Sequence, residues 1–129
     1  MAMTAHVVFS ALDPAQPATT SATIIEQVIR GSIGFQGLLM SDDVSMNALS
    51  GSIAERTRAI LAAGCDMVLH CNGNLDEMRE VARETPVLSG KALERATRAL
   101  ASRRAPQLFD RVASRAELDD LIGRAGVGA

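Results

Sequence analysis

The sequence predicts an α/β fold in which parallel strands alternate with helices. The first observation is a set of three short apolar runs, at residues 3–9, 37–41 and 66–71, none of which alternates cleanly with polar residues. Strands that are buried on both faces have this pattern, and parallel sheets covered by helices contain such strands. The second observation is that segments of helical periodicity separate the runs, which gives the order strand, helix, strand, helix, strand.

The two segments between the apolar runs predict one helix each. After the proline-containing loop "LDPAQPATTS", Ser21 can cap a helix that Gly31 or Gly34 can end. Its inward face would be formed by aliphatic residues at helical spacing, namely Ile24, Ile25, Val28 and Ile29. The second helix is expected at about residues 53–63, where it would stop at Gly64 and turn inward Ile53, Ile60 and Leu61.

The C-terminal third predicts further helices. Residues 73–85 have a helical spacing of apolar side chains, and Ser89 can cap a following helix whose buried stripe would be Leu93, Ala96 and Leu100. Pro106 then interrupts the chain. Ser114 precedes Glu117 by three positions, a capping-box pattern that predicts one short helix at about 114–122 with a frayed glycine-rich end. We therefore divide the chain into residues 1–104 and a tail of residues 105–129.

Composition argues against several classes of function. The 129 residues carry a net charge of -2, so there is no basic field that would hold nucleic acid. No apolar segment approaches the roughly 20 residues that span a bilayer, and no charged leader precedes the first apolar run, which predicts a cytoplasmic protein without a membrane partner. Cys65 and Cys71 are expected to be reduced thiols, and since no second ligand pair accompanies His70 and Cys71, we expect no metal or cofactor.

Two adjacent aspartates, Asp42 and Asp43, end the second apolar run in the stretch "LLMSDDVSM". The carboxyl ends of parallel strands form the functional edge of such folds. Neighbouring residues on a strand point to opposite faces, so one carboxylate should face a cleft while the other anchors the loop. The alternative is that both only cap the next helix or hydrogen-bond the loop, a common use of Asp after a strand.

Three stretches, "MTAHVVFSALDPAQPATTS", "GFQGLLMSDDVSMNAL" and "ILAAGCDMVLHCN", follow one another along the chain. Together they resemble the C-terminal part of the catalytic domain of family 3 glycoside hydrolases, and most of all the bacterial β-N-acetylhexosaminidases of peptidoglycan recycling. The resemblance implies a partial (β/α)8 TIM barrel, with the last three parallel strands and their helices in residues 1–104. It also implies a saccharide substrate with a terminal N-acetylglucosamine, taken from cell-wall muropeptides.

The resemblance also assigns roles to residues. The family pattern of a Gly-Phe-x-Gly lead, apolar residues, then Ser or Thr and the nucleophilic Asp places Asp42, and not Asp43, at the nucleophile of a retaining glycosidase. His6, in a "TAH" motif, is implied to line the cleft or support it, and Met46 to pack beside the substrate. The resembled enzymes carry their acid/base histidine on an earlier glycine-rich loop that this sequence does not contain. We therefore expect the isolated chain to be inactive.

Two other interpretations remain open. An acidic pair after an apolar strand also occurs in receiver-like signalling modules that bind magnesium, but such modules need a lysine at a later strand end, and the only lysine is Lys91 at a helix start. Alternatively, the chain is a non-catalytic piece that completes a barrel with a partner chain supplying the missing strands.

Overall fold

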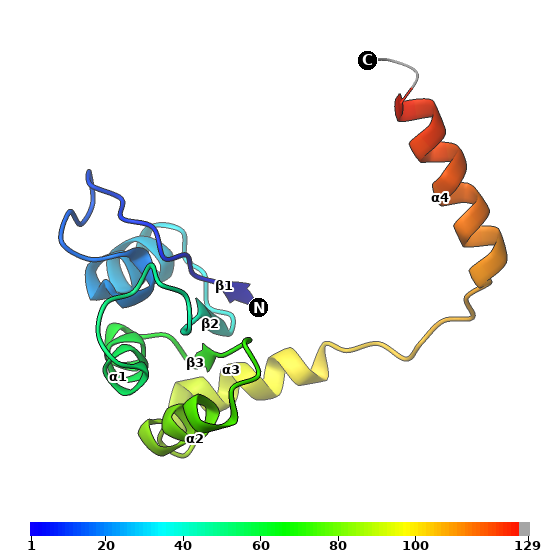
Figure 1. Ribbon diagram of the computed structural model, residues 1–129. Coiled ribbons are helices and arrows are strands. Elements are labelled where there is room, and N and C mark those ends of the chain that lie inside the picture. Colours follow the sequence, from blue (N-terminus) through cyan, green and yellow to red (C-terminus); the bar gives the residue numbers. More distant parts are fainter. Residues whose placement is uncertain (127–129) are drawn as a thin grey trace.

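The computed structural model describes residues 1–126 and contains a parallel three-stranded sheet with helices packed beside it (Figure 1). The strands β1 (Ala2–Met3), β2 (Leu39–Asp43) and β3 (Met67–Leu69) lie in the order β1-β2-β3. Both pairings are parallel. The predicted α/β class, the parallel arrangement and the placing of one helix between successive strands are therefore confirmed.

The first strand is much shorter than the predicted run of residues 3–9. Thr4 N still donates to Met40 O of β2, but after this residue the backbone leaves the sheet, and Val7 O accepts a hydrogen bond from Ala18 N. The apolar residues that follow are about half exposed: Val7, Val8 and Phe9. An apolar run therefore forms a strand only where a neighbouring strand offers backbone partners, and here β2 does so for two residues.

The helix after the first loop is a π-helix, η2 (Ile24–Ser32), and follows a short 3-10 turn, η1 (Ala18–Thr20). Ser21 Oγ accepts from Ile24 N at 3.1 Å, so the predicted cap is confirmed. Ile33 N donates to Val28 O, five residues back, instead of to a residue four back. Over only nine residues, the apolar spacing does not distinguish this wider helix from an α-helix.

The helix α1 (Ile53–Ala63) has the predicted bounds. A capping box between Ser52 and Glu55 begins it, and Gly64 ends it at φ 107°, a left-handed conformation that suits glycine. Ile60 is fully buried as expected. Ile53 and Leu61 are only partly buried.

The three C-terminal helices are α2 (Leu75–Glu84), α3 (Gly90–Ala101) and α4 (Arg111–Gly126). The predicted buried stripe of α3 is wrong except at Ala96, because Leu93 and Leu100 are 47% and 60% exposed. The short helix predicted at 114–122 is longer than expected, because Asp110 Oδ1 accepts from Val112 N and Ala113 N and so begins the helix earlier. The last residues of the predicted frayed end, 127–129, lie outside the described residues.

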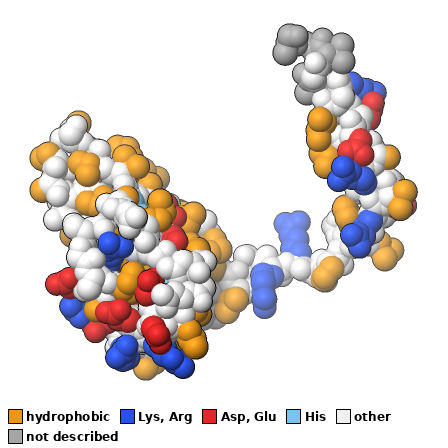
Figure 2. Space-filling model, viewed as in Figure 1, with side chains coloured by type: hydrophobic (Ala, Val, Ile, Leu, Met, Phe, Trp, Pro, Cys, Tyr) orange, Lys and Arg blue, Asp and Glu red, His pale blue; other side chains and the backbone are white. Residues whose placement is uncertain are grey.

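The helix α4 stands apart from the rest of the chain at the end of an extended connection, residues 102–110 (Figure 1). The other elements, from β1 to α3, form one body. On the face shown in Figure 2, acidic and basic side chains are interspersed over the lower part of this body, and hydrophobic side chains dominate its upper, N-terminal part. No helix within residues 1–126 is long and apolar enough to cross a membrane.

The core of the body lies between β2 and the helices η2 and α1. It consists of the buried residues Ile25, Leu39, Val44, Leu49, Ile60, Ala63 and Cys65. Along β2, Leu39 and Ser41 are fully buried, whereas Met40 and Asp42 are partly exposed. Successive side chains of a strand alternate between faces. Asp42 therefore shares with Met40 the face of the sheet that points away from this core.

Candidate active site

Asp42 lies at the carboxyl end of β2 and is partly exposed. Its Oδ1 accepts a hydrogen bond from Asp43 N at 2.8 Å. Within residues 1–126, this is the only hydrogen bond that its carboxylate makes. One carboxylate oxygen is thus oriented by the backbone, while Oδ2 makes no hydrogen bond to residues 1–126.

Asp43 is directed into the surrounding loops. Its Oδ1 accepts from Ser45 N at 3.0 Å and from Cys71 N at 3.1 Å, and its Oδ2 accepts from Ser45 Oγ at 2.7 Å. Burial alone would raise the pKa of Asp43, but these hydrogen bonds, together with the nearby His70, hold it below its ordinary value of 3.8. The two aspartates therefore differ in environment, and Asp43 is the one that anchors the loop.

His6 lies on the segment after β1 and contacts the backbone of Asp43. The Nε2 atom is 2.9 Å from Asp43 O, and Nδ1 is 2.9 Å from Thr19 Oγ1. Because a carbonyl oxygen can only accept, Nε2 carries the hydrogen, which leaves Nδ1 to accept from the Thr19 hydroxyl in the neutral ring. Thr4 Oγ1 donates to Thr19 Oγ1 at 3.0 Å and completes the network. His6 thus supports the end of β2, and both of its nitrogens are engaged.

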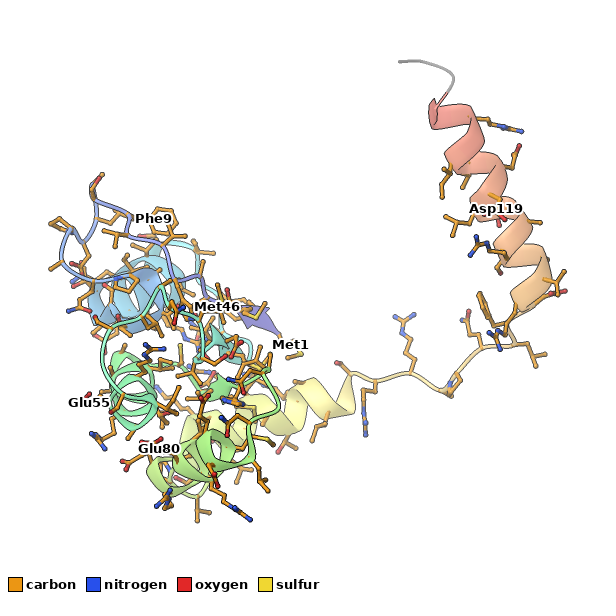
Figure 3. All side chains as sticks on the ribbon, in the orientation of Figure 1. Met1, Phe9, Met46, Glu55, Glu80 and Asp119 are labelled. Atoms are coloured by element: carbon orange, nitrogen blue, oxygen red, sulfur yellow. The ribbon has the colours of Figure 1, made fainter. Side chains whose placement is uncertain are left out.

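Met46 lies on the loop between β2 and α1, where Figure 3 labels it, and it is exposed. The loop is shaped by Arg56 of α1, whose Nη1 donates to Val44 O at 3.2 Å and to Met46 O at 3.1 Å, and whose Nε donates to Gly51 O at 2.9 Å. This guanidinium fixes the backbone that carries the Met46 side chain. In the sequence, Arg56 looks like an ordinary outward-facing helix residue, and no pattern there predicts its contacts with this loop.

A second polar group, whose contacts no pattern in the sequence predicts, lies after β3. His70 Nε2 is 3.0 Å from Glu77 Oε2, and Glu77 also accepts from Asn72 Nδ2 at 2.7 Å. The hydrogen bonds from His70 and then from Asn72 lower the pKa of Glu77. The His70 side chain is only 6% exposed. Within residues 1–126, its Nδ1 has no hydrogen-bond partner. The only hint in the sequence is the first-turn position of Glu77 in α2.

These polar groups do not form a metal centre. In the described part of the chain, no three His, Cys, Asp or Glu side chains are grouped so that they could hold a metal ion. His70 instead faces Glu77, and Cys71 contributes its backbone N–H to Asp43.

The amino end of the sheet has a structural role. Asp66, whose side chain is 4% exposed, pairs with Arg30 of η2 at 2.9 Å and with Arg95 of α3 at 2.8 Å. Its Oδ2 also accepts from Leu39 N at 2.8 Å. One carboxylate therefore joins two helices to the start of β2, at the edge opposite Asp42.

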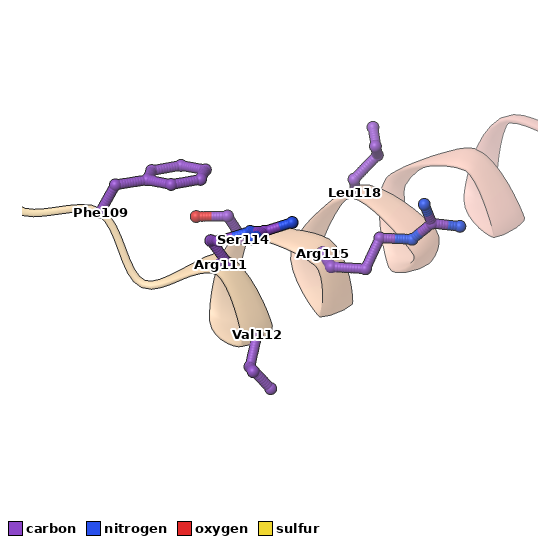
Figure 4. Close-up of a pocket in the computed structure, with 6 residues that line it drawn as sticks. All are labelled: Phe109, Arg111, Val112, Ser114, Arg115 and Leu118. Carbon is purple, nitrogen blue, oxygen red and sulfur yellow. The ribbon is translucent and has the colours of Figure 1, made fainter.

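A hollow of about 780 Å³ lies at the start of α4, far from these groups (Figures 3 and 4). It is lined by Phe109, Arg111, Val112, Ser114, Arg115 and Leu118. Since its lining includes no carboxylate and belongs to the segment outside the body, we assign the candidate site to the carboxyl edge of the sheet.

Comparison with known proteins finds relatives of the body of the chain. The family described as Glycosyl hydrolase family 3 N terminal domain matches residues 1–103. A protein named Beta-hexosaminidase from Idiomarina loihiensis is 35% identical over 108 residues, which are 82% of this chain and 32% of the relative. Another of that name, from Alkalilimnicola ehrlichii, is 50% identical over 72 residues, which are 54% of this chain and 20% of the relative.

Solved structures show the same likeness. The β-N-acetylhexosaminidase of Beutenbergia cavernae superposes with a TM-score of 0.60 at 31% identity, over 78% of this chain and 32% of that one. The β-N-acetylglucosaminidase of Thermotoga maritima does so with a TM-score of 0.62 at 30% identity, over 79% of this chain and 25% of that one. The chain thus spans between 20% and 32% of the length of these four proteins. This likeness bears out the predicted fold, part of a (β/α)8 barrel, and the chain belongs to glycosyl hydrolase family 3.

Proposed function

We propose that this chain provides the nucleophile strand of a retaining β-N-acetylhexosaminidase, with Asp42 as the nucleophile. The observation that supports this most directly is the difference between the two aspartates: Asp43 is saturated by hydrogen bonds from its loops, whereas Asp42 keeps Oδ2 unengaged by residues 1–126 on the face away from the core. A nucleophile needs such a fixed carboxylate with an oxygen available to the sugar.

The chemistry has two steps. In the first, a carboxylate oxygen of Asp42 forms a bond with the anomeric carbon, the glycosidic bond breaks, and the leaving oxygen takes a proton from an acid. In the second, the conjugate base of that acid removes a proton from water, the water oxygen bonds to the anomeric carbon, and Asp42 leaves as a carboxylate. We place the acid/base group on a segment other than residues 1–126, because the enzymes that this sequence resembles carry it on a glycine-rich loop that the sequence does not contain.

The substrate class follows from the relatives. Proteins named Beta-hexosaminidase and β-N-acetylglucosaminidase share this part of the chain, which supports a saccharide with a terminal N-acetylglucosamine. The finer proposal, a cell-wall muropeptide hydrolysed in the cytoplasm, rests on the resemblance of the three sequence stretches to recycling enzymes. In it, Met46 packs beside the sugar from its partly exposed loop, and His6 supports the site through Asp43 O.

The proposal includes a partner for the sheet. Within residues 1–126, β1 pairs along one edge only, with β2, and Met3 of β1 is more than half exposed. Parallel strands of a barrel are paired on both edges and covered on both faces. We therefore propose that further strands of the barrel, on this polypeptide's own extension or on a second chain, pair with β1 and supply the acid/base loop.

The test is turnover of 4-nitrophenyl N-acetyl-β-glucosaminide. The 129-residue polypeptide alone should give no appreciable turnover. A nitrophenolate can leave without an acid, but the second step still needs the base, and a positioned proton transfer contributes roughly 100- to 10,000-fold. Co-expression with the remaining strands of a relative, such as the Idiomarina loihiensis protein, should give activity that Asp42→Asn abolishes and Asp43→Asn only weakens. Activity that survives Asp42→Asn, or turnover by the polypeptide alone that depends on Asp42, would contradict the proposal.

A further inference from the structure

Asp43 connects the carboxyl ends of all three strands. Its backbone oxygen accepts from His6 Nε2, on the segment after β1, at 2.9 Å. Its Oδ1 accepts from Cys71 N, on the segment after β3, at 3.1 Å. The next peptide N–H, that of Val44, donates to Leu69 O of β3 at 2.8 Å. The peptide that follows Asp43 is therefore held at its oxygen from one side and at its nitrogen from the other.

The side chain of Asp43 is equally constrained. Ser45 N and Cys71 N share Oδ1, and Ser45 Oγ donates to Oδ2, so both carboxylate oxygens have donors from the protein. Hydrogen bonds to an ionised acceptor are the stronger kind, and three of them on one carboxylate fix its rotamer. This arrangement leaves Asp43 without a free oxygen for chemistry and makes it a rigid fastening point.

The remaining polar atom of Asp43 is its N–H, which donates to Asp42 Oδ1 at 2.8 Å. We propose that Asp43 is the positioning residue for Asp42: it holds Oδ1 through its own backbone and so selects Oδ2 as the oxygen presented to the saccharide. This inference rests on the proposed function, in which Asp42 is the nucleophile. It makes the orientation of Asp42 depend on the loops after β1 and β3 as well as on its own strand.

The test is amide hydrogen exchange of the 129-residue chain at single-residue resolution, corrected for intrinsic rates. Asp43→Ala should speed exchange roughly tenfold or more at the amides of both Cys71 and residue 43. The Cys71 amide loses its hydrogen bond to a charged carboxylate, and the backbone of residue 43 is no longer held by its own side chain. Asp43→Asn, whose side-chain oxygen can still accept from Cys71 N, should restore most of the protection. Asp42→Ala should speed exchange at residue 43 and leave Cys71 unchanged.

A matched control is Asp119→Ala, which removes an exposed carboxylate on α4 and should change neither amide. Unchanged exchange at residue 43 in Asp43→Ala would overturn the proposal. An equal rise in the exchange rates of residues 43 and 71 in Asp42→Ala would also overturn it. The whole carboxyl edge of the sheet would then respond to any substitution there. If Asp43→Ala unfolds, failure of Asp43→Asn to protect Cys71 overturns it instead. Exchange needs no turnover, so co-expressed activity that survives Asp42→Asn would contradict the proposed function and leave this result standing.

Discussion

His6 Nε2 lies 2.9 Å from the backbone oxygen of Asp43, so the segment after β1 is fastened to the end of β2 by a side chain and not by strand pairing. This contact replaces the backbone ladder that stops after Thr4. It also explains how a strand of two residues can hold a long loop in place beside the candidate site.

His6→Ala should therefore destabilise the body and loosen the site. Asp43 O and the Thr19 hydroxyl would lose their partner, and a part-buried polar group left unpaired costs about 1–3 kcal/mol. Urea unfolding should show this loss in the free energy of unfolding. Gln16→Ala, which removes only an exposed bond to Thr20 Oγ1, is the control and should change it by less than about 0.5 kcal/mol. Equal effects of the two substitutions would show that the His6 contact contributes nothing specific.

Asp66→Ala should be among the most destabilising substitutions in the chain. It would leave Arg30 and Arg95, both largely buried, without their shared carboxylate and would leave Leu39 N without an acceptor. Removing one partner of a buried ion pair costs about 3–5 kcal/mol. Chemical unfolding should show this loss, while Asp119→Ala, which breaks a pair whose carboxylate is 55% exposed, should cost about 0.5 kcal/mol or less. A mild effect of Asp66→Ala would mean that Arg30 and Arg95 find other partners.

The sequence predicts the fold best where the signal is local. The bounds of α1 follow from its cap at Ser52 and its stop at Gly64, both of which act within one turn of the helix. The length of β1 and the burial of α3 depend on what lies beside them. Leu93 and Leu100 have the spacing of a buried stripe, but no neighbour covers them in the described part of the chain. Periodicity shows which face is apolar and does not show whether a partner is present.

In the candidate site, too, the sequence predicts what depends on local pattern and does not predict what depends on distant contacts. The alternation of side chains along a strand predicts that Asp42 and Asp43 differ in role, and the hydrogen bonds of Asp43 agree with this. The contact between His6 and Asp43 O joins residues 37 positions apart, and no local pattern encodes it. The pairing of His70 with Glu77 depends on how α2 packs against the end of β3, so no local pattern in the sequence predicts it.

The two cysteines should react differently with a thiol reagent. Burial raises the pKa of the Cys65 thiol from 9.0 to about 11, whereas Cys71 is exposed. At pH 8, iodoacetamide should label one thiol in the native protein and both in urea, as read by mass spectrometry. Cys71→Ala should remove the native label. Rapid native labelling of Cys65 would show that the core between η1 and β3 opens readily.

The same shift predicts a loss of stability in alkali. The folded state keeps its Cys65 proton up to about pH 11, whereas the unfolded chain releases it near pH 9.0, so stability falls as pH rises between these values. The loss approaches roughly 2–3 kcal/mol and is absent below pH 9. Cys65→Ala should remove this part of the pH dependence of urea unfolding, and Cys71→Ala should keep it. A slope that is the same in both variants would contradict the assignment to Cys65.

Removal of the tail after Arg104 should leave the stability of the body unchanged. The helix α4 stands apart from the other elements (Figure 1), and an isolated helix of 16 residues is marginally stable in water even with good helix formers. The tail does expose large apolar side chains, namely Leu108, Phe109, Val112, Leu121 and Ile122. Such surface promotes association, as do the half-exposed Val8 and Phe9 of the body. The truncated chain should therefore have the same urea midpoint as the full chain. In sedimentation velocity, the ratio of its weight-average mass to its monomer mass should be smaller than that of the full chain. The association that remains would arise from the open edge of β1. A free energy of unfolding lowered by more than about 1 kcal/mol would mean that α4 packs against the body in solution. The division of the chain at residue 104 would then be wrong.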